Sequence, residues 1–252
     1  LNILKLRKVK DRLRFVATNK NPSFEERLDY ALDSRANLNN SGEKLHDFNS
    51  NVVLEEIKEG PVKIYKFIPP NSSKEKYGIY FHGGGYFAGS ITSHKNLISQ
   101  ISNDSNLIIY FFEYRLSPEY NFPSAHEDAK LAVDFINTLH PDHQSIWIGE
   151  SAGGGLATGL VVDKEYLEKP DNLILLSPWL DLSDGFEDKK FFKNSDVTII
   201  IEGMFEVGEF YAGDYGAKNP ILSPVYADVD NFPDVLIQVC TEELPVSYTH
   251  LR

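Results

Sequence analysis

The feature that most constrains the fold of this chain is an alternation of short apolar runs with stretches of helical pattern. In chain order, the apolar runs are GIYFH, NLIIYFFEY, SIWIGE, NLILLSP and DVLIQVC. Stretches with helical spacing lie between them, at 93–102, at 124–139 and from Ala152 onward. Strands that are apolar throughout and alternate with helices are typical of a parallel sheet covered on both faces. The sequence therefore predicts an α/β fold with a mostly parallel, twisted sheet.

Two further strands and two helical additions are expected around this alternation. The runs NVVLEEI and VKIYKFIPP have the pattern of strands that meet at the Glu59-Gly60-Pro61 turn. A helix is also expected near 198–213, in a stretch that interrupts the alternation. We expect three parts, which are an N-terminal helical cap segment at 1–48, a core at 49–244 and a cap insertion within it at 181–220.

Charge and composition disfavour several classes of protein. The formal net charge of -12 would repel the phosphates of nucleic acid. The longest apolar runs, such as LIIYFF, are too short to cross a bilayer, and the basic, amphipathic opening is expected to pack on the domain rather than on a membrane. Cys240 is the only cysteine, so no intrachain disulfide can form, and no signal-peptide pattern is present. We therefore expect a cytoplasmic protein.

The segment IWIGESAGGGLA contains a candidate nucleophile. Gly149-Glu150-Ser151-Ala152-Gly153 lies between an expected strand and an expected helix, which is the context that a G-x-S-x-G nucleophile elbow requires. Its glycines permit a turn too sharp for larger residues. A glycine-rich turn that only packs a helix on a sheet is the alternative, and the strand before and helix after favour the catalytic interpretation.

A second glycine-rich segment, HGGGY, follows the strand GIYFH. If Ser151 attacked an acyl group, the resulting oxyanion would need backbone N–H donors on the other side of the pocket. Gly83, Gly84 and Gly85 can provide these donors, because glycine lets the backbone approach the substrate closely. Ala152, at the start of the following helix, adds another N–H.

Together these motifs resemble the hormone-sensitive lipase-like family of α/β-hydrolases, which includes many microbial carboxylesterases. HGGGY and GESAGG match its two signatures, and YRLSPEYNFPSAHEDA, LLSPWLDLS and LSPVYADVDNFPDVLIQV resemble its other segments, over residues 50–244. The resemblance implies an α/β-hydrolase core with a helical cap and no metal or organic cofactor. It also implies that Ser151 is the nucleophile, that His82 anchors its own loop, and that the oxyanion donors are Gly84, Gly85 and Ala152.

The acid of the implied triad should follow the strand DVLIQVC, because the fold family has the order Ser, acid, His. This leaves Glu242 or Glu243. The match to the family segment favours Glu243, but most members carry Asp there, so both residues stay open. Asp181, in PWLDL, is a weaker rival that more often has a structural place in the family.

No histidine of the chain is well placed to be the base. His250 follows Ser151 but lies only seven positions after Glu243, whereas a parallel crossover needs about a dozen residues. The upstream histidines are interpreted as surface or capping residues, and they are His46, His94, His126, His140 and His143. We therefore expect that the base His is not present in this chain.

The terminal residues PVSYTHLR depart from the family pattern and resemble a translated sequencing adapter. We expect that native sequence ends near Leu244, that 245–252 is a non-native tail, and that a final strand, helix and His-bearing loop are absent. A chain without its base should hydrolyse esters weakly or not at all.

These inferences predict a serine carboxylesterase that hydrolyses short to medium acyl esters through an acyl-enzyme. An amidase or formamidase of the same fold is one alternative, because a triad alone does not distinguish esters from amides. A hydrolase-like protein that binds a small molecule without turning it over is the other. The expected partner is a small-molecule ester, and a homodimer is compatible with the sequence.

Overall fold

The computed structural model describes residues 22–58, 60–183, 201–229 and 232–239. Within them, seven strands form one sheet in the order β1-β2-β4-β3-β5-β6-β7. Strand β2 pairs antiparallel with both of its neighbours, and all other pairs are parallel. The strands are β1 (Val53–Ile57), β2 (Lys63–Ile68), β3 (Lys76–Phe81), β4 (Ile108–Glu113), β5 (Gln144–Glu150), β6 (Asn172–Leu176) and β7 (Asp234–Gln238). The predicted mostly parallel sheet is confirmed.

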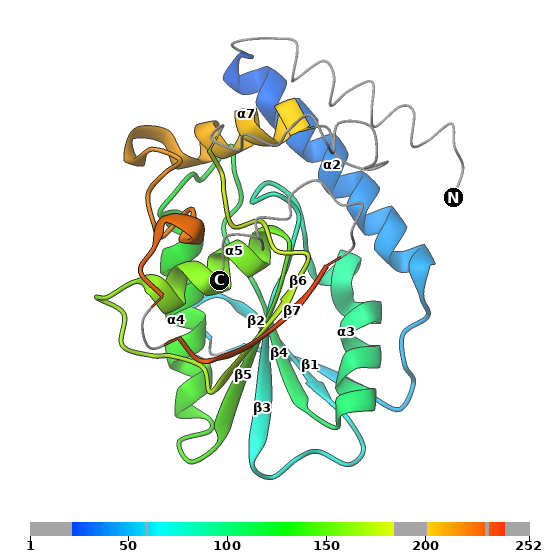
Figure 1. The fold of residues 1–252 in the computed structure, drawn as a ribbon. Helices are drawn as coiled ribbons and strands as arrows, with labels where there is room; N and C mark the ends of the chain where they lie inside the picture. Colours follow the sequence, from blue (N-terminus) through cyan, green and yellow to red (C-terminus); the bar gives the residue numbers. More distant parts are fainter. Residues whose placement is uncertain (1–21, 59, 184–200, 230–231, 240–252) are drawn as a thin grey trace.

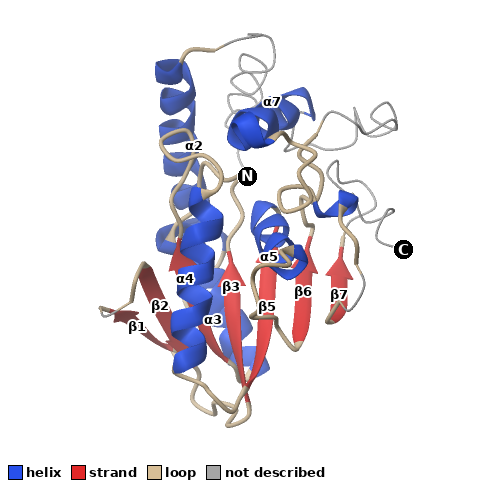
Figure 2. Cartoon of the chain, turned by 90° about the vertical axis from the view of Figure 1, so that its left-hand side faces the viewer, coloured by secondary structure: helices blue, strands red, loops and turns tan. Residues whose placement is uncertain are grey.

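Helices lie on both faces of this sheet (Figure 1, Figure 2). The α-helices of the described residues are α2 (Phe24–Leu45), α3 (Ile91–Ser105), α4 (Ser124–Thr138), α5 (Ala152–Val162) and α7 (Ile201–Ala212). Two 3-10 turns, η1 (Gly213–Tyr215) and η2 (Pro224–Tyr226), follow α7. Each strand and helix expected from the sequence within these ranges is present.

The core consists of two apolar clusters, one on each face of the sheet. Ile79 and Phe81 of β3 belong to the larger cluster, with Trp147 of β5 and the buried residues of α4 and α5. Tyr80, between them in sequence, belongs to the second cluster, which includes Ile98 of α3. Successive side chains of a strand point to opposite faces, so an apolar strand such as β3 contributes to both clusters and must be covered on both sides.

The central strands β3 and β5 place two loops side by side. Phe81 of β3 is opposite Gly149 of β5 in the parallel register. Both strands therefore end at the same level, and the segments that follow them, HGGGY and ESAGG, leave the sheet next to each other. In α/β sheets of this kind, ligands bind outside the carboxyl ends of the strands.

The two helices α2 and α7 meet beyond this same end of the sheet (Figure 2). Ser23 caps α2, where its Oγ accepts from the Glu26 backbone N–H and the Glu26 side chain accepts from the Ser23 N–H. Arg27 of α2 forms an ion pair with Glu206 of α7, and its guanidinium lies 4.0 Å from the centre of the Phe210 ring. We call α2 and α7 the cap helices below. Residues 1–21 and 184–200 of the expected cap lie outside the described residues.

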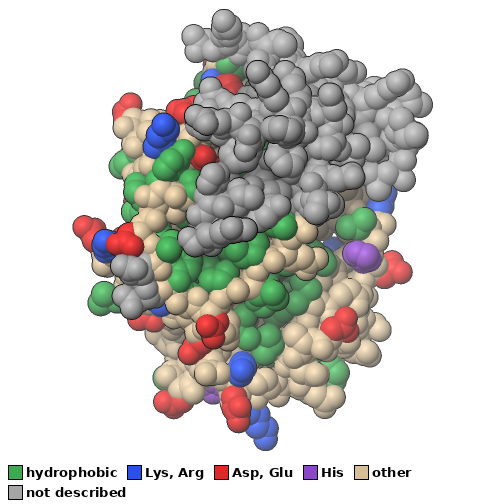
Figure 3. Space-filling view, in the orientation of Figure 1, with side chains coloured by type: hydrophobic (Ala, Val, Ile, Leu, Met, Phe, Trp, Pro, Cys, Tyr) green, Lys and Arg blue, Asp and Glu red, His purple; other side chains and the backbone are tan. Residues whose placement is uncertain are grey.

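The last strand of the sheet order, β7, carries exposed apolar side chains. Val235 and Leu236 are 40% and 61% exposed. Figure 3 shows apolar side chains near the middle of one face of the molecule, with separate acidic and basic side chains around them. The expectation that a final strand, helix and His-bearing loop are absent concerns residues outside the described ranges and stays a prediction. No helix in the described ranges is long and apolar enough to cross a membrane.

Candidate active site

Ser151 lies at the sharp turn between β5 and α5. Its backbone has φ 50° and ψ −121°, a conformation that costs a non-glycine residue about 1–3 kcal/mol and persists only where the surroundings hold it. The surroundings do so, because the Ser151 N–H donates to the Leu176 carbonyl at 3.0 Å and the Ser151 carbonyl accepts from the Trp179 N–H at 2.8 Å. This strained strand-to-helix turn has the backbone geometry expected for a nucleophile elbow.

Gly153 allows α5 to begin directly against the end of β3. A Cβ at this position would lie 2.0 Å from the Phe81 carbonyl oxygen and 2.5 Å from that of His82. No side chain fits there, so a glycine is required for the first turn of α5 to contact the neighbouring strand. This contact places Ser151 and Ala152 beside the HGGGY segment.

The HGGGY segment forms a tight loop (residues 82–89), which we call the oxyanion loop after the role that the sequence predicts for it. Gly84 and Gly85 have φ of 113° and 62°, and the Gly84 carbonyl accepts from the N–H groups of Phe87 and Ala88 at 3.1 and 2.9 Å. Among the described residues, the N–H groups of Gly84 and Gly85 donate to no backbone carbonyl. The Ala152 N–H belongs to the first turn of α5, where intrahelical acceptors are missing. The chain thus brings together N–H groups available for an anion.

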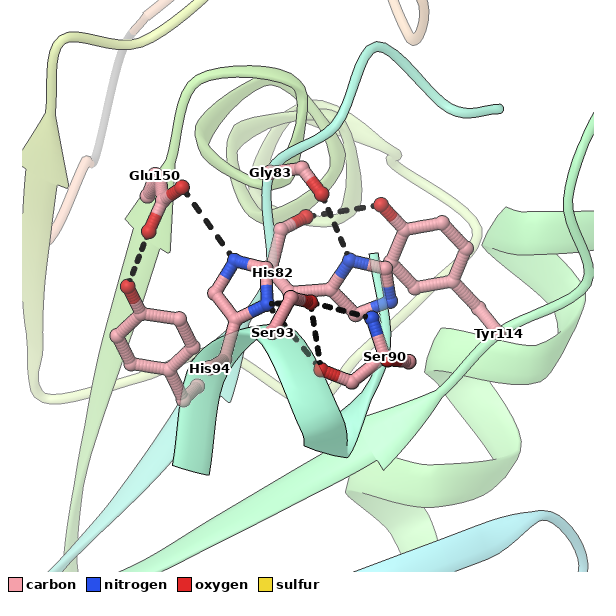
Figure 4. Close-up of polar contacts among 8 residues, drawn as sticks. His82, Gly83, Ser90, Ser93, His94, Tyr114 and Glu150 are labelled. Carbon is pink, nitrogen blue, oxygen red and sulfur yellow. Dashed lines mark hydrogen bonds and ion pairs between the residues drawn. The ribbon is translucent and has the colours of Figure 1, made fainter. Parts of the chain in front are cut away.

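His82 is buried at the base of the oxyanion loop and is held there on several sides (Figure 4). Its ring stacks on Tyr114 with ring centres 4.0 Å apart, and the Tyr114 hydroxyl donates to the His82 carbonyl at 2.8 Å. Because its Nδ1 faces the Gly83 carbonyl at 2.8 Å, that nitrogen carries the proton. Burial lowers the pKa of His82 to about 3. The ring is therefore neutral near pH 7 and poorly suited to accept a proton.

Glu150, next to the serine, forms a network that reaches α3 (Figure 4). Its carboxylate accepts from the Tyr80 hydroxyl at 2.5 Å, and its other oxygen lies 3.4 Å from Nε2 of His94. Burial alone would raise the pKa of Glu150, but His94 and then Tyr80 stabilise the charged form and hold the pKa below its usual value. A Cβ on Gly83 would lie 2.7 Å from this carboxylate. An ionised carboxylate thus lies directly beneath the oxyanion loop.

Comparison with known proteins identifies the family to which this architecture belongs. The model of a family described as having the alpha/beta hydrolase fold matches residues 78–248, more than half of the chain. The chain belongs to the α/β-hydrolase family. The crystal structure of EstE7, a hormone-sensitive lipase homologue from a metagenome library, matches with a TM-score of 0.79 and 30% identity, covering 96% of this chain and 82% of that one. For EstE5 the TM-score is 0.81 and the identity 26%, with the same coverage. The predicted hormone-sensitive lipase-like branch is confirmed.

Several curated relatives of this α/β-hydrolase carry names of ester hydrolases. An esterase of Acinetobacter venetianus is 28% identical over 70% of this chain and 60% of its own length. An acetyl-hydrolase of Streptomyces hygroscopicus is 30% identical over 66% of this chain and 56% of its own. An ethyl acetate hydrolase of Pseudomonas putida is 33% identical over 49% of this chain and 42% of its own. The matches thus span 60% or less of the length of these relatives.

Two of the upstream histidines of this α/β-hydrolase are not the surface or capping residues that the sequence predicted. His94 and His126 are 4% and 3% exposed, because α3 and α4 turn them toward the sheet and α5 respectively. Polar residues of an amphipathic helix usually face the solvent. Here His94 instead contacts Glu150, and His126 contacts the Phe122 ring, so both are buried. None of the described histidines forms a hydrogen bond with Ser151.

Of the three candidate acids of the α/β-hydrolase site, only Asp181 lies within the residues that the structure describes. The Asp181 carboxylate accepts from the N–H and hydroxyl of Ser183 at 2.9 and 2.8 Å, and from the Tyr226 hydroxyl at 3.2 Å. These contacts give Asp181 a structural place. Glu242 and Glu243 lie outside the described residues, as does His250. In the described part of the chain, no group of three or more His, Cys, Asp or Glu side chains could hold a metal ion.

The sequence reasoning missed the residues that hold the oxyanion loop from outside it. Tyr80, His94 and Tyr114 bind Glu150 or His82, and Arg35 of α2 binds the carbonyl of Phe87. One signal was present, since a histidine inside the apolar stripe of the expected helix at 93–102 is unusual. Arg35 gave no comparable signal, because its partners lie 52 and more positions away.

Proposed function

We propose that this α/β-hydrolase is a serine carboxylesterase that hydrolyses short to medium acyl esters through an acyl-enzyme intermediate. The observation that supports the proposal is the strained Ser151 turn at the end of β5, since the neighbouring strand β3 ends at the same level and leads into the loop of Gly84 and Gly85. A serine needs backbone N–H donors when its oxygen attacks a carbonyl, because the carbonyl oxygen becomes an anion.

In this proposal, the Ser151 hydroxyl oxygen attacks the ester carbonyl while the N–H groups of the loop and of Ala152 bind the developing oxyanion. The alcohol leaves, and water then releases the acid from the acylated serine. Glu243, with Glu242 as the alternative, orients the histidine that transfers the protons. Gly83 completes the loop, and Gly149 and Gly153 keep the turn in place. The names of the acetyl-hydrolase and ethyl acetate hydrolase relatives favour short acyl groups.

A panel of p-nitrophenyl esters with acyl chains of 2 to 12 carbons tests the proposal, with the Ser151→Ala variant as the matched control. We expect hydrolysis to exceed that of Ser151→Ala, to be fastest with the short chains, and to leave an acyl mass on the peptide that contains Ser151. The catalysis that remains in a hydrolase without its base comes from the oxyanion hole and from binding, and does not depend on the serine, so the assay is run on the protein extended through its base histidine. Equal rates for the protein and Ser151→Ala would contradict the proposal.

The same assay separates the alternatives. Faster cleavage of anilides than of esters would indicate an amidase. Within the described residues, no histidine is bonded to Ser151, which favours the binding-protein alternative. That alternative predicts saturable binding of an ester with no acylation of Ser151.

A further inference from the structure

A single guanidinium connects the cap helix α2 to two loops of the core. The Nε of Arg35 donates to the Phe87 carbonyl at 2.8 Å, and its Nη2 donates to the Ser117 carbonyl at 3.0 Å. Both terminal nitrogens donate to the Glu119 carboxylate at 2.7 Å, one to each oxygen. Such a two-pronged pair fixes the plane of the guanidinium. The Arg35 side chain is only 21% exposed, so these bonds are partly shielded from water.

The Phe87 carbonyl that Arg35 binds is part of the oxyanion loop. Three carbonyls of this loop accept hydrogen bonds. That of Gly84 accepts from the N–H groups of Phe87 and Ala88, and that of Tyr86 accepts from the Ser117 N–H at 2.9 Å. The third, that of Phe87, accepts from Arg35. Within the described residues, Arg35 is the one side chain from outside the loop that donates to these three carbonyls.

The Phe87 carbonyl and the Ala88 N–H belong to one planar peptide unit, and the Ala88 N–H donates to the Gly84 carbonyl at 2.9 Å. The Gly84 carbonyl in turn shares a planar peptide unit with the Gly85 N–H, so holding the Phe87 carbonyl also fixes the direction of that donor. A peptide that rotates to turn its carbonyl inward turns the adjoining N–H groups away from the oxyanion. Gly84 and Gly85 are especially free to rotate, since neither has a Cβ. External hydrogen bonds are therefore needed to keep the donors in position before the substrate arrives.

The cap side of the loop is also part of this arrangement. A small hollow lies between the cap helices and the loops, and Phe87, Pro118 and Phe210 are among its lining residues. The Phe87 ring separates the hollow from Gly85, where a Cβ would lie 2.6 Å from that ring. The Arg27–Glu206 ion pair joins α2 to α7 across the same hollow. The position of α2 is thus transmitted to the oxyanion loop through both the ring and the carbonyl of Phe87.

We propose that Arg35 is a positioning residue for the oxyanion hole, which it holds in its anion-binding form from the cap. The inference rests on the proposed function, since it assigns the loop's N–H groups to the oxyanion. Arg35 touches neither the substrate nor the reacting atoms. It acts by holding the Phe87 peptide, while its pair with Glu119 holds the guanidinium.

Two variants separate this role from a general stabilising one. Glu119→Gln removes the charged partner but leaves the Arg35 Nε free to bind Phe87, so we expect kcat for p-nitrophenyl butyrate within about threefold of the original. Arg35→Met keeps the length of the side chain and removes every hydrogen bond. We expect it to lower kcat about tenfold or more with KM within twofold, because a misplaced donor weakens transition-state binding specifically. Arg35→Lys, which keeps one donor, should recover part of the loss.

Amide hydrogen exchange provides a measurement that does not depend on turnover. Peptides covering 83–89 should exchange at least tenfold faster in Arg35→Met than in Glu119→Gln, whereas peptides from β5 should exchange alike in both. If the protein hydrolyses no faster than Ser151→Ala, the proposed function fails, and the exchange data still decide whether Arg35 holds the loop. Equal exchange of 83–89 and equal kcat in the two variants would overturn the proposal.

Discussion

Buried neutral histidines should make this α/β-hydrolase sensitive to mild acid. His82 and His126 are 0% and 3% exposed, and burial lowers the pKa of each from 6.5 to about 3. The carbonyl of Ile221 partly opposes this effect at His126, while Lys130 adds to it. The unfolded chain therefore binds more protons than the folded chain between these two values. Stability is fully present above pH 6.5 and is lost progressively as the pH falls toward 3.

The size of the effect follows from the two pKa values. For one histidine with a pKa of 6.5 unfolded and about 3 folded, lowering the pH from 7 to 5 lowers the free energy of unfolding by about 2 kcal/mol. His82 and His126 together therefore account for about 4 kcal/mol, which is a large fraction of the 5–15 kcal/mol typical of a folded domain. The window from pH 7 to 5 is chosen because few carboxylates with ordinary pKa values titrate within it.

His126→Leu isolates one of these contributions away from the candidate site. Leucine keeps an apolar contact with the Phe122 ring, which meets the imidazole edge to face at 4.9 Å. We expect the free energy of unfolding of this variant to fall between pH 7 and 5 by about 2 kcal/mol less than that of the original protein. His46→Gln, at an exposed position, is the matched control for the replacement of a histidine.

Urea unfolding followed by tryptophan fluorescence at pH 7, 6 and 5 gives these free energies, provided that the transition is two-state. An NMR titration of the His126 ring protons adds a direct reading of its protonation. If His126→Leu lost as much stability as the original protein between pH 7 and 5, the buried neutral state of His126 would be refuted.

Three further predictions concern the candidate site. Gly153→Ala should destabilise the protein by about 1–3 kcal/mol in thermal unfolding and abolish ester hydrolysis, because the new Cβ would displace α5 from β3. Normal hydrolysis by this variant would show that the close contact between α5 and β3 is not required. Glu150→Gln should lower kcat about tenfold with little change in KM, since it disrupts the hydrogen bonds to Tyr80 and His94 that hold this side chain against Gly83, and an unchanged kcat would contradict this. Asp181→Asn should change the rate of ester hydrolysis less than about threefold, whereas Glu243→Gln should lower this rate at least about a hundredfold. If Glu242→Gln lowered the rate instead, Glu242 would be the acid of the triad.

The main elements of the fold could be predicted from the sequence because they depend on local patterns. Apolar runs such as GIYFH and SIWIGE are too short for helices and are flanked by helical periodicity, so β3 and β5 were predictable within a few residues. The G-x-S-x-G and HGGGY segments could be assigned for the same reason, since each glycine pattern reflects a local steric requirement. Gly153 is an example. A tight strand-turn-helix connection leaves no space for a side chain at this position, so glycine is expected there from the local pattern alone.

The supporting contacts of the site could not be predicted in the same way. His94 and Glu150 are 56 positions apart, and Arg35 and Glu119 are 84 apart. A charged or imidazole side chain on a helix has the same local pattern whether it faces water or a buried partner. Only the three-dimensional packing of α2 and α3 on the core decides between these outcomes.

The position of these contacts has a consequence for how the site is adjusted. Its proposed anion donors are backbone N–H groups, two of glycines and one of an alanine, so no polar side chain of a donor residue can alter their strength or direction. The loop is instead held by side chains on three separate elements. Glu150 of β5 lies against Gly83 and is itself held by His94 of α3, Tyr114 binds the His82 carbonyl from the segment after β4, and Arg35 binds the Phe87 carbonyl from α2. Differences in rate among hydrolases with the same glycine motif should therefore arise in these outer contacts rather than in the motif itself.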